Sequence, residues 1–387
     1  MNESPRIHES PADFGEALAE VESILADSSL PPRRALVGFD GFIDTFIEME
    51  DPASMAEFGP QVEQAAGIST SFPVRHEGDR FGGNGPLLAC GLRALLGASS
   101  HLTYYGGLGR QEPLPVFAEA LDGWVDRIHS FADPAHSDCL QFRDGKIMLS
   151  DLRNCAEVTW EALLARVGEG TLDEDLATTD CIAAVNWGKL PHAGRIWEQL
   201  AHRLETLGRA GDRIPFFMDL AEFSFRAEED KRGLQDTLRT IAARSTAILS
   251  LNLKEAWQLG EVAGARGVGE RERPAVARLA DDLRAWSAVD RLVIHPNDGA
   301  LVSEAAGTVS LPGPLSRDPV RSVGAGDNFG AGILAGALHG LHGEALLLLG
   351  VLASGTFVRT GEFPQPEAVT RVLRRWREGT LGDRLED

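Results

Sequence analysis

The sequence predicts a three-layer α/β/α protein with a mainly parallel central sheet and a small β lid. From residue 181 onward, short apolar runs alternate with helical segments, which is typical of a parallel sheet covered on both faces. Upstream, Asp144-Gly145 separates two runs of alternating polar and apolar residues and indicates an antiparallel hairpin outside that alternation. A chain of 387 residues is long enough for one large domain with a small addition.

The expected elements divide the chain into an N-terminal tail and helix at 1–33 and a main domain at 34–387. Residues 1–11 are expected to be disordered, and residues 11–28 have the apolar spacing of an amphipathic helix. Strands are expected at the short apolar runs 34–39, 102–106, 181–186, 215–220, 247–251, 291–295 and 300–303. Helices are expected at 86–97, up to 208, up to 244 and through the C-terminal third. The lid is expected to come from about 45–81, an irregular stretch, and 138–152.

Composition excludes several classes of protein. A formal charge of −21 argues against a nucleic-acid binder, because such proteins neutralise phosphates with Lys and Arg. No run approaches roughly eighteen uninterrupted apolar residues, and the N-terminus lacks a signal-peptide core. We therefore expect a cytoplasmic protein without a membrane partner. The four cysteines lack the spacing of a zinc or redox motif and are expected to be reduced and packed.

The most informative stretch is Gly324-Ala325-Gly326-Asp327, which leads directly into an apolar helical run. Small residues at a helix N-terminus leave backbone N–H groups and the positive end of the helix dipole open to an anion. A carboxylate at such an anion site is electrostatically unfavourable unless it has a function. Asp327 beside a bound phosphate can take the proton of an attacking hydroxyl, so the pattern predicts phosphoryl transfer.

Two other interpretations compete for the same residues. The spacing resembles a dinucleotide fingerprint, but such a fingerprint follows a strand and opens a βαβ unit, whereas this loop follows a Pro-rich segment. Alternatively, the glycines could form a turn and a small-residue packing face. Packing accounts for the later Gly330, Gly332 and Gly336 but does not explain an Asp after Gly-Ala-Gly.

Four features occur in one order: an early strand ending in Asp, a Gly-Gly loop that opens a helix, an Asn-x-x-Glu and the late Gly-Ala-Gly-Asp. Over residues 34–375 the chain thereby resembles the ribokinase-like, PfkB-type family of carbohydrate and nucleoside kinases. The resemblance implies ATP- and Mg²⁺-dependent transfer of a γ-phosphate to a hydroxyl of a sugar or sugar-like alcohol. It also implies a lid that closes over the sugar and excludes water, and it allows a homodimer through that lid.

Residue by residue, the resemblance makes Asp327 the base and Gly324, Ala325 and Gly326 the anion hole for the γ-phosphate. Asn252 and Glu255 match the element that organises Mg²⁺ through water molecules near the nucleotide, and Gly299 is placed with the nucleotide-binding residues. A carboxylate and an amide suit that task because they can fix the water shell of a metal. Asn252 and Glu255 also fit a helix capping box, and both interpretations can hold together.

The residues that would bind the sugar are less clearly defined by the sequence. Asp40 and Asp44 both lie where the family presents an Asp to sugar hydroxyls, and the sequence does not decide between them; either could also be a turn or cap residue. The loop that lets backbone approach the substrate matches Gly82, Gly83 and Asn84.

Three departures from the family pattern leave function partly open. Leu87 stands where the family usually has Asn, Arg321-Ser322 replaces Asp-Thr, and residues 48–80 have no clear match. Because the replaced Asp helps bind a monovalent cation in some relatives, Arg321 predicts activity independent of potassium. Arg321 could instead support the loop, touch a phosphate or have no role. Alternative functions are a nucleoside or vitamin-precursor kinase and a non-catalytic regulatory paralogue that binds sugar or nucleotide.

Overall fold

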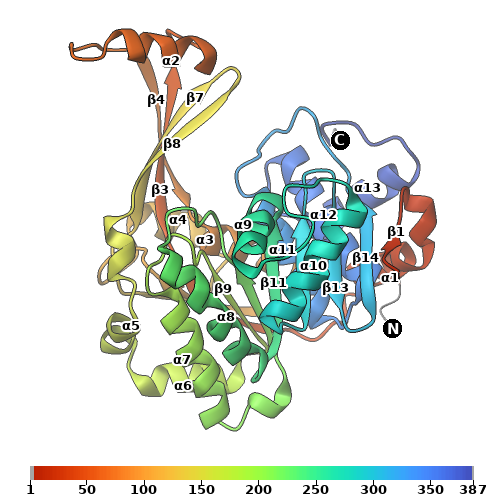
Figure 1. Cartoon of the computed structure of the whole chain (residues 1–387). Helices are drawn as coiled ribbons and strands as arrows, with labels where there is room; N and C mark the ends of the chain where they lie inside the picture. Colours follow the sequence, from red (N-terminus) through yellow and green to blue (C-terminus); the bar gives the residue numbers. More distant parts are fainter. Residues whose placement is uncertain (1–3, 386–387) are drawn as a thin grey trace.

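The computed structural model describes residues 4–385, and its larger sheet has ten strands in the order β1-β14-β13-β12-β11-β10-β9-β2-β5-β6 (Figure 1). All neighbouring strands in this sheet are parallel except β13, which is antiparallel to β12 and β14. The predicted parallel alternation is therefore confirmed. The strands are β1 (Arg6–Ile7), β2 (Arg34–Phe39), β5 (His101–Gly106), β6 (Arg127–Ser130), β9 (Cys181–Val185), β10 (Pro215–Asp219), β11 (Thr246–Asn252), β12 (Arg291–His295), β13 (Gly299–Glu304) and β14 (Gly307–Pro312).

Two layers of helices cover the faces of this sheet, each with its own hydrophobic core, so the predicted three layers are confirmed. One face is covered by α5 (Trp160–Val167), α6 (Glu169–Thr178), α7 (Ala193–Thr206), α8 (Glu228–Ala242), α9 (Leu253–Ala263) and α10 (Arg273–Ser287). The other is covered by α1 (Gly15–Ala26), α3 (Asn84–Leu96), α4 (Pro115–Leu121), α11 (Ala325–Leu338), α12 (Gly343–Thr360) and α13 (Pro366–Arg377). Short 3-10 helices are η1 (Pro11–Phe14), η2 (Arg153–Glu157) and η3 (Ala210–Asp212).

The N-terminal segment is more ordered than its polar sequence suggests. Arg6 and Ile7 form β1, which pairs in parallel with β14, and the Arg6 guanidinium lies 2.7 Å from the Glu344 carboxylate. The expectation of disorder over 1–11 is therefore wrong for residues 6–7, because the edge of β14 offers backbone partners that the local sequence does not reveal. Residues 1–3 lie outside the described part of the chain.

A second sheet, in the order β4-β3-β7-β8, projects from the main body (Figure 1). It consists of β3 (Phe42–Met49), β4 (Val74–Gly82), β7 (Ala135–Phe142) and β8 (Gly145–Asp151), and the predicted β7–β8 hairpin is present. The stretch expected to be irregular is largely regular, since α2 (Met55–Gln64) connects β3 to β4 at the far end of the sheet. The ring of Phe58 on α2 lies 5.0 Å from that of Phe72 and 5.2 Å from that of Phe142, which anchors the helix there.

The helix α12 is long and apolar enough to cross a membrane by length and composition alone. Within the protein, however, 78% of it is buried against the sheet and its neighbouring helices. Its apolar composition is therefore accounted for by packing in the core.

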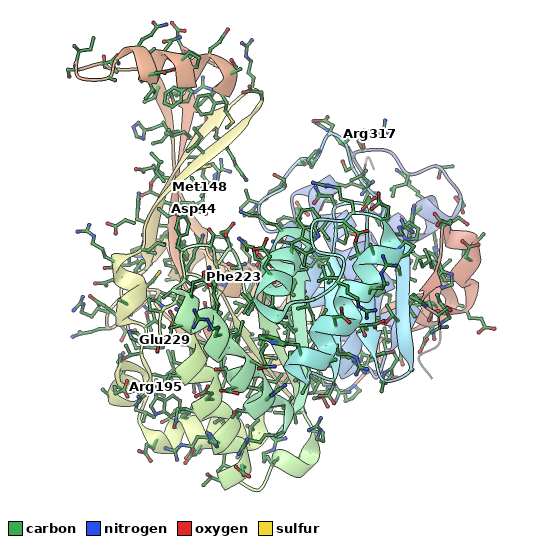
Figure 2. The ribbon with its side chains drawn as sticks, in the orientation of Figure 1. Asp44, Met148, Arg195, Phe223, Glu229 and Arg317 are labelled. Atoms are coloured by element: carbon green, nitrogen blue, oxygen red, sulfur yellow. The ribbon has the colours of Figure 1, made fainter. Side chains whose placement is uncertain are left out.

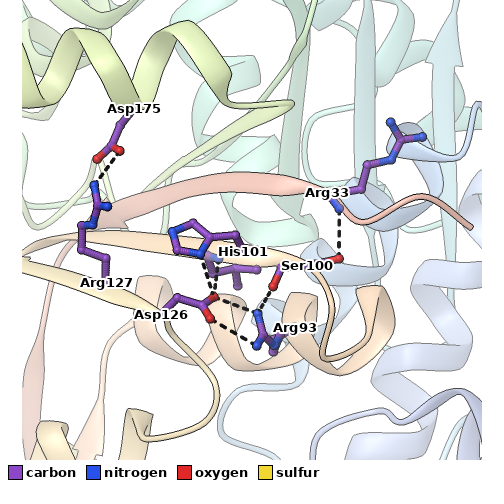
Figure 3. Close-up of polar contacts among 8 residues, drawn as sticks. Arg33, Arg93, Ser100, His101, Asp126, Arg127 and Asp175 are labelled. Carbon is purple, nitrogen blue, oxygen red and sulfur yellow. Dashed lines mark hydrogen bonds and ion pairs between the residues drawn. The ribbon is translucent and has the colours of Figure 1, made fainter.

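The amino ends of β2, β5 and β6 are tied together at the edge of the sheet opposite the candidate site (Figure 3). The Asp126 carboxylate accepts hydrogen bonds of 2.8 Å from the Arg93 guanidinium and from the Leu102 amide. At β6, the Arg127 guanidinium lies 3.0 Å from the Asp175 carboxylate. These contacts attach α3 and α6 to the starts of β5 and β6. They stabilise the end of the large sheet that lies opposite the candidate site.

Candidate active site

Polar residues gather at the carboxyl edge of the large sheet, where ligands bind in open α/β proteins. Asp40 and Asn186 directly follow β2 and β9, and Asp219, Asn252 and His295 are the last residues of β10, β11 and β12. Because these strands are neighbours and parallel, their ends present this set along one edge. The amino ends of α3 and α11, which pack side by side, begin at the same edge.

Asp40 is fully buried, and its carboxylate is already occupied by the protein. It accepts hydrogen bonds of 2.8 Å from the amides of Asn84 and Gly85 and one of 2.6 Å from the side-chain amide of Asn186. Burial raises the pKa of Asp40, and these three donors oppose that shift. Asp40 therefore holds the Gly83–Gly85 turn at the start of α3, where Gly83 has a φ of 103° that favours glycine.

Asp44 differs from Asp40. Only 7% of the residue is exposed, yet its carboxylate makes no hydrogen bond with any of residues 4–385. It is the third residue of β3, in the second sheet (Figure 2). A Cβ at position 82 would overlap its carboxylate, which explains Gly82. Burial raises the pKa of Asp44, and the positive charge of Lys189 opposes the shift.

Asp327 lies in the first turn of α11, after Gly324 with a φ of 97°. Its Oδ1 accepts a hydrogen bond of 2.8 Å from the side-chain amide of Asn84, so the two helix starts meet at this carboxylate. Burial, followed by the negative charges of Asp219 and Asp40, raises the pKa of Asp327 well above its usual range. The hydrogen bond from Asn84 and the charge of Lys189 act in the opposite direction.

Two more buried carboxylates, Asp219 and Glu255, interact electrostatically with Asp327. Burial raises the pKa of Asp219 to about 6, with a further contribution from Asp40. Burial also raises the pKa of Glu255, and the negative charges of Asp219, Glu222 and Asp327 add to it. Mutual repulsion among these carboxylates favours the binding of a cation that arrives with a ligand.

Asn252 and Glu255 form the capping box that their spacing allows. The Asn252 Oδ1 accepts from the Glu255 amide at 3.0 Å, and the Glu255 Oε2 accepts from the Asn252 amide at 3.0 Å. A further hydrogen bond of 2.6 Å joins the Asn252 side-chain amide to the Glu255 Oε1. Over residues 4–385, no three His, Cys, Asp or Glu side chains converge closely enough to chelate a metal by themselves.

A cavity of about 430 Å³ adjoins this edge on the side of α11 and α12. Its lining contains Asn252, His295, Gly299, Ala325 and Gly326, so two of the residues predicted for the nucleotide, Asn252 and Gly299, share one cavity with part of the predicted anion hole. Glu255 and Gly324 are not among the lining residues. The rest of the lining comes mostly from the loop before α11 and from α12, with Pro314, Leu315, Pro319, Val351 and Val358.

Four polar residues near the site were not identified from the sequence: Asn186, Lys189, Asp219 and His295. Each lies at or just after the end of a strand that the sequence does predict, and that position is the signal that could have found them. The Lys189 ammonium lies 4.8 Å from the Phe42 ring centroid and acts on the pKa values of both Asp44 and Asp327. His295 lines the cavity, and its ring centroid lies 4.7 Å from that of Phe329.

Two of the departures noted in the sequence have clear structural positions. Leu87 is buried in α3, and its Cδ1 lies 3.3 Å from where a Cβ on Gly324 would be, so it supports the turn at Gly324 by packing. Arg321 lies in the loop before α11, with its guanidinium carbon 5.2 Å from the centroid of the Phe357 ring.

Comparison with known proteins agrees with this architecture. A curated ketohexokinase from Haloferax volcanii is 25% identical over 355 residues, which cover 87% of this chain and 90% of that protein. The solved ribokinase of Arabidopsis thaliana, complexed with ribose and ATP, has a TM-score of 0.64 at 16% identity, covering 89% of this chain and 99% of that one. The ribokinase of Thermotoga maritima has a TM-score of 0.62 at 15% identity, covering 89% and 100% of the two chains.

These solved structures share the fold of this protein. The sequence model of prokaryotic ketohexokinase matches residues 15–376, which include the second sheet, the larger sheet except β1, and the whole candidate site. The chain therefore belongs to the prokaryotic ketohexokinase family and is an ATP-dependent carbohydrate kinase.

Proposed function

We propose that this kinase phosphorylates a hydroxyl of a ketohexose and that Asp327 is its general base. The observation that carries the proposal is the position of the Asp327 carboxylate, which lies in the first turn of α11, directly after the cavity-lining residues Ala325 and Gly326, and is held by the side-chain amide of Asn84. The ketohexose is inferred from the family and from the Haloferax volcanii relative.

The reaction needs one bond to form and one to break. The acceptor oxygen bonds to the γ-phosphorus while the bond from that phosphorus to the β–γ bridging oxygen breaks, and the acceptor proton moves to Asp327. Backbone N–H groups at Gly324, Ala325 and Gly326 are placed at a helix N-terminus and stabilise the charge on the transferred group. The raised pKa of Asp327 makes it a stronger base once it is ionised.

Magnesium fits the carboxylates on the nucleotide side of Asp327. Asp219 and Glu255 are both buried, and the negative charge of Asp219 raises the pKa values of Glu255 and Asp327, which is the situation a bound cation relieves. When bound with ATP, Mg²⁺ neutralises phosphate charge. Asn252 and Glu255 would hold its water molecules, with their mutual hydrogen bonds fixing the orientation of both side chains.

On the acceptor side, we assign sugar binding to Asp44 and a positioning role to Asp40. The Asp44 carboxylate has capacity for sugar hydroxyls, whereas Asp40 already holds Asn84 and Gly85. The second sheet then acts as the lid, with Gly82, Gly83 and Asn84 leading from β4 into the site. Its closure would exclude water from the phosphoryl group.

We also propose that the enzyme works in the cytoplasm, without nucleic-acid or membrane partners, and pairs with a second copy through the second sheet. The charge of −21 opposes phosphate-backbone binding. Along β8, Met148 and Leu149 are 40% and 54% exposed, which supports the pairing. Sedimentation analysis of the wild type and of a Leu149→Asp variant tests the proposed pairing. Equal masses for the two proteins would contradict it.

Asp327→Asn tests the proposed chemistry. With fructose and other ketoses as acceptors, kcat should fall by about two to four orders of magnitude while ATP binding survives, because the variant keeps the shape but cannot take a proton. Asp318→Asn, in the exposed loop before α11, is the control. A wild-type preference for nucleosides over ketoses would overturn the substrate assignment, and near-normal turnover of the variant would remove Asp327 as base.

A further inference from the structure

Arg321 is held beside the start of α11 by an aromatic ring. Its guanidinium carbon lies 5.2 Å from the centroid of Phe357, and Cζ of the same ring lies 3.2 Å from where a Cβ on Gly324 would be. Phe357 is fully buried and therefore fixed. Arg321 and the Gly324 turn thus share one rigid platform, which places the guanidinium next to the anion hole.

Arg80 approaches the same region from the second sheet. It lies directly across from Asp44 in the β3–β4 pairing, and its guanidinium carbon lies 4.6 Å from the centroid of the Phe46 ring. Residues paired across two antiparallel strands have side chains on the same face of the sheet. Arg80 therefore shares a face with Asp44, the carboxylate that we assign to the sugar.

Geometry places both arginines around the proposed acceptor site, because Arg80 lies across from Asp44 and Arg321 shares the Phe357 platform with the Gly324 turn. The positive charge of Arg80 adds to burial in lowering the pKa of Arg321, while Asp327 and Asp44 oppose that shift. Within residues 4–385, neither guanidinium forms an ion pair or hydrogen bond, although Arg75 on the same strand pairs with Glu48 and Glu77. In a chain with 58 acidic residues, two neighbouring guanidinium groups without a partner at the reaction site indicate a negatively charged ligand.

We infer that Arg321 and Arg80 form a phosphate-binding pair that engages a phosphoryl group on the acceptor side of Asp327. The inference rests on the proposed kinase function. A phosphoryl group there comes from the γ-phosphate in transit or is already present on a phosphorylated sugar. The first source is expected, because Arg321 adjoins the anion hole in which that group lies.

Such a pair would link chemistry to closure of the second sheet. Without a phosphate, the like charges of Arg80 on the second sheet and Arg321 on the main body repel each other. A phosphoryl group with two negative charges attracts both, so its presence favours approach of the sheet that carries Asp44. The arginines remain protonated throughout, and the proton of the acceptor still moves to Asp327.

The test compares Arg321→Ala and Arg80→Ala with matched controls. Arg317→Ala changes an exposed arginine in the same loop as Arg321 (Figure 2), and Arg75→Ala changes another arginine of β4. We expect kcat with ketose and ATP to fall about 10²- to 10³-fold for Arg321→Ala and about tenfold for Arg80→Ala, with both controls near wild type. Arg321→Lys and Arg80→Lys should recover part of the loss, which separates lost charge from misfolding.

A second measurement separates the sources of the phosphate. In the presence of sugar, the wild type should bind a non-hydrolysable ATP analogue more tightly than ADP. The alanine variants should lose this preference by a factor similar to their loss of kcat. Loss of activity with phosphorylated sugars alone would assign the pair to a phosphate on the acceptor. Unchanged kcat and an unchanged analogue-to-ADP ratio in both variants would overturn the inference. If the wild type phosphorylates no sugar, the proposed function fails, while the binding ratio still tests the pair.

Discussion

The side-chain amide of Asn84 donates a hydrogen bond of 2.8 Å to the Oδ1 of Asp327, joining two residues 243 positions apart in the chain. Asn84 is the first residue of α3, and Asp327 is the third residue of α11. A hydrogen bond to a carboxylate favours its ionised form, whereas burial and neighbouring carboxylates favour the protonated one. The contact therefore helps to keep the proposed base ionised and oriented.

We expect Asn84→Ala to raise the pKa of Asp327 further, because it removes the donor that favours the ionised carboxylate. The acid limb of the pH profile of kcat should move to higher pH. At pH 6.5, kcat should fall by about tenfold, with a smaller loss at pH 9. An equal loss at both pH values would show that Asn84 acts only through the shape of the site.

Asp44→Asn and Asp40→Asn should have different effects. Asp44→Asn should raise the KM for sugar by about 10- to 100-fold and leave the KM for ATP unchanged, because it weakens charged hydrogen bonds to hydroxyls. Asp40→Asn would place an amide donor against the N–H groups of Asn84 or Gly85, or against the Asn186 amide, and should lower the free energy of unfolding by about 1 to 3 kcal/mol. Steady-state kinetics and thermal unfolding measure the two effects, and a reversed pattern would exchange the two roles.

Asp219 should reduce stability above pH 6. Its pKa rises from 3.8 to about 6 in the folded protein, so between these values the folded state binds the proton more tightly than the unfolded chain. The resulting stabilisation is present below pH 4 and is lost as pH rises through 6. We therefore expect Asp219→Asn to raise the free energy of unfolding by about 1 to 3 kcal/mol at pH 7.5 but little at pH 4. Denaturation at both pH values checks this, and a pH-independent difference would contradict it.

Activity should be nearly the same in potassium and sodium at matched ionic strength. Arg321 carries a permanent positive charge where cation-activated relatives of the wider family have an Asp, and a cation is not bound favourably beside another cation. Initial rates in chloride salts of the two metals provide the measurement. Strong activation by potassium would show that a cation binds in spite of the guanidinium.

Local sequence determined much of the fold. Apolar runs indicate buried strands, Asp144-Gly145 indicates a hairpin turn, and the small residues before α11 indicate the start of a helix. Each of these signals lies within a few residues of chain, so it can be predicted without distant contacts. The capping box at Asn252 and Glu255 is local for the same reason. The pairing of β1 with β14 was missed, because an edge strand offers partners that local sequence does not show.

Tertiary structure decided which of these polar groups meet. The sequence does not decide between Asp40 and Asp44, whereas packing of α3 on the end of β2 uses the Asp40 carboxylate and leaves that of Asp44 without a hydrogen bond among residues 4–385. The neighbouring charges of Asp219 and Asp327, and of Arg80 and Arg321, come from separate elements. Their proximity depends on strand order and helix packing, and burial then sets the pKa of each group. Periodicity reports which face of an element is buried, but it does not report which other element lies against that face.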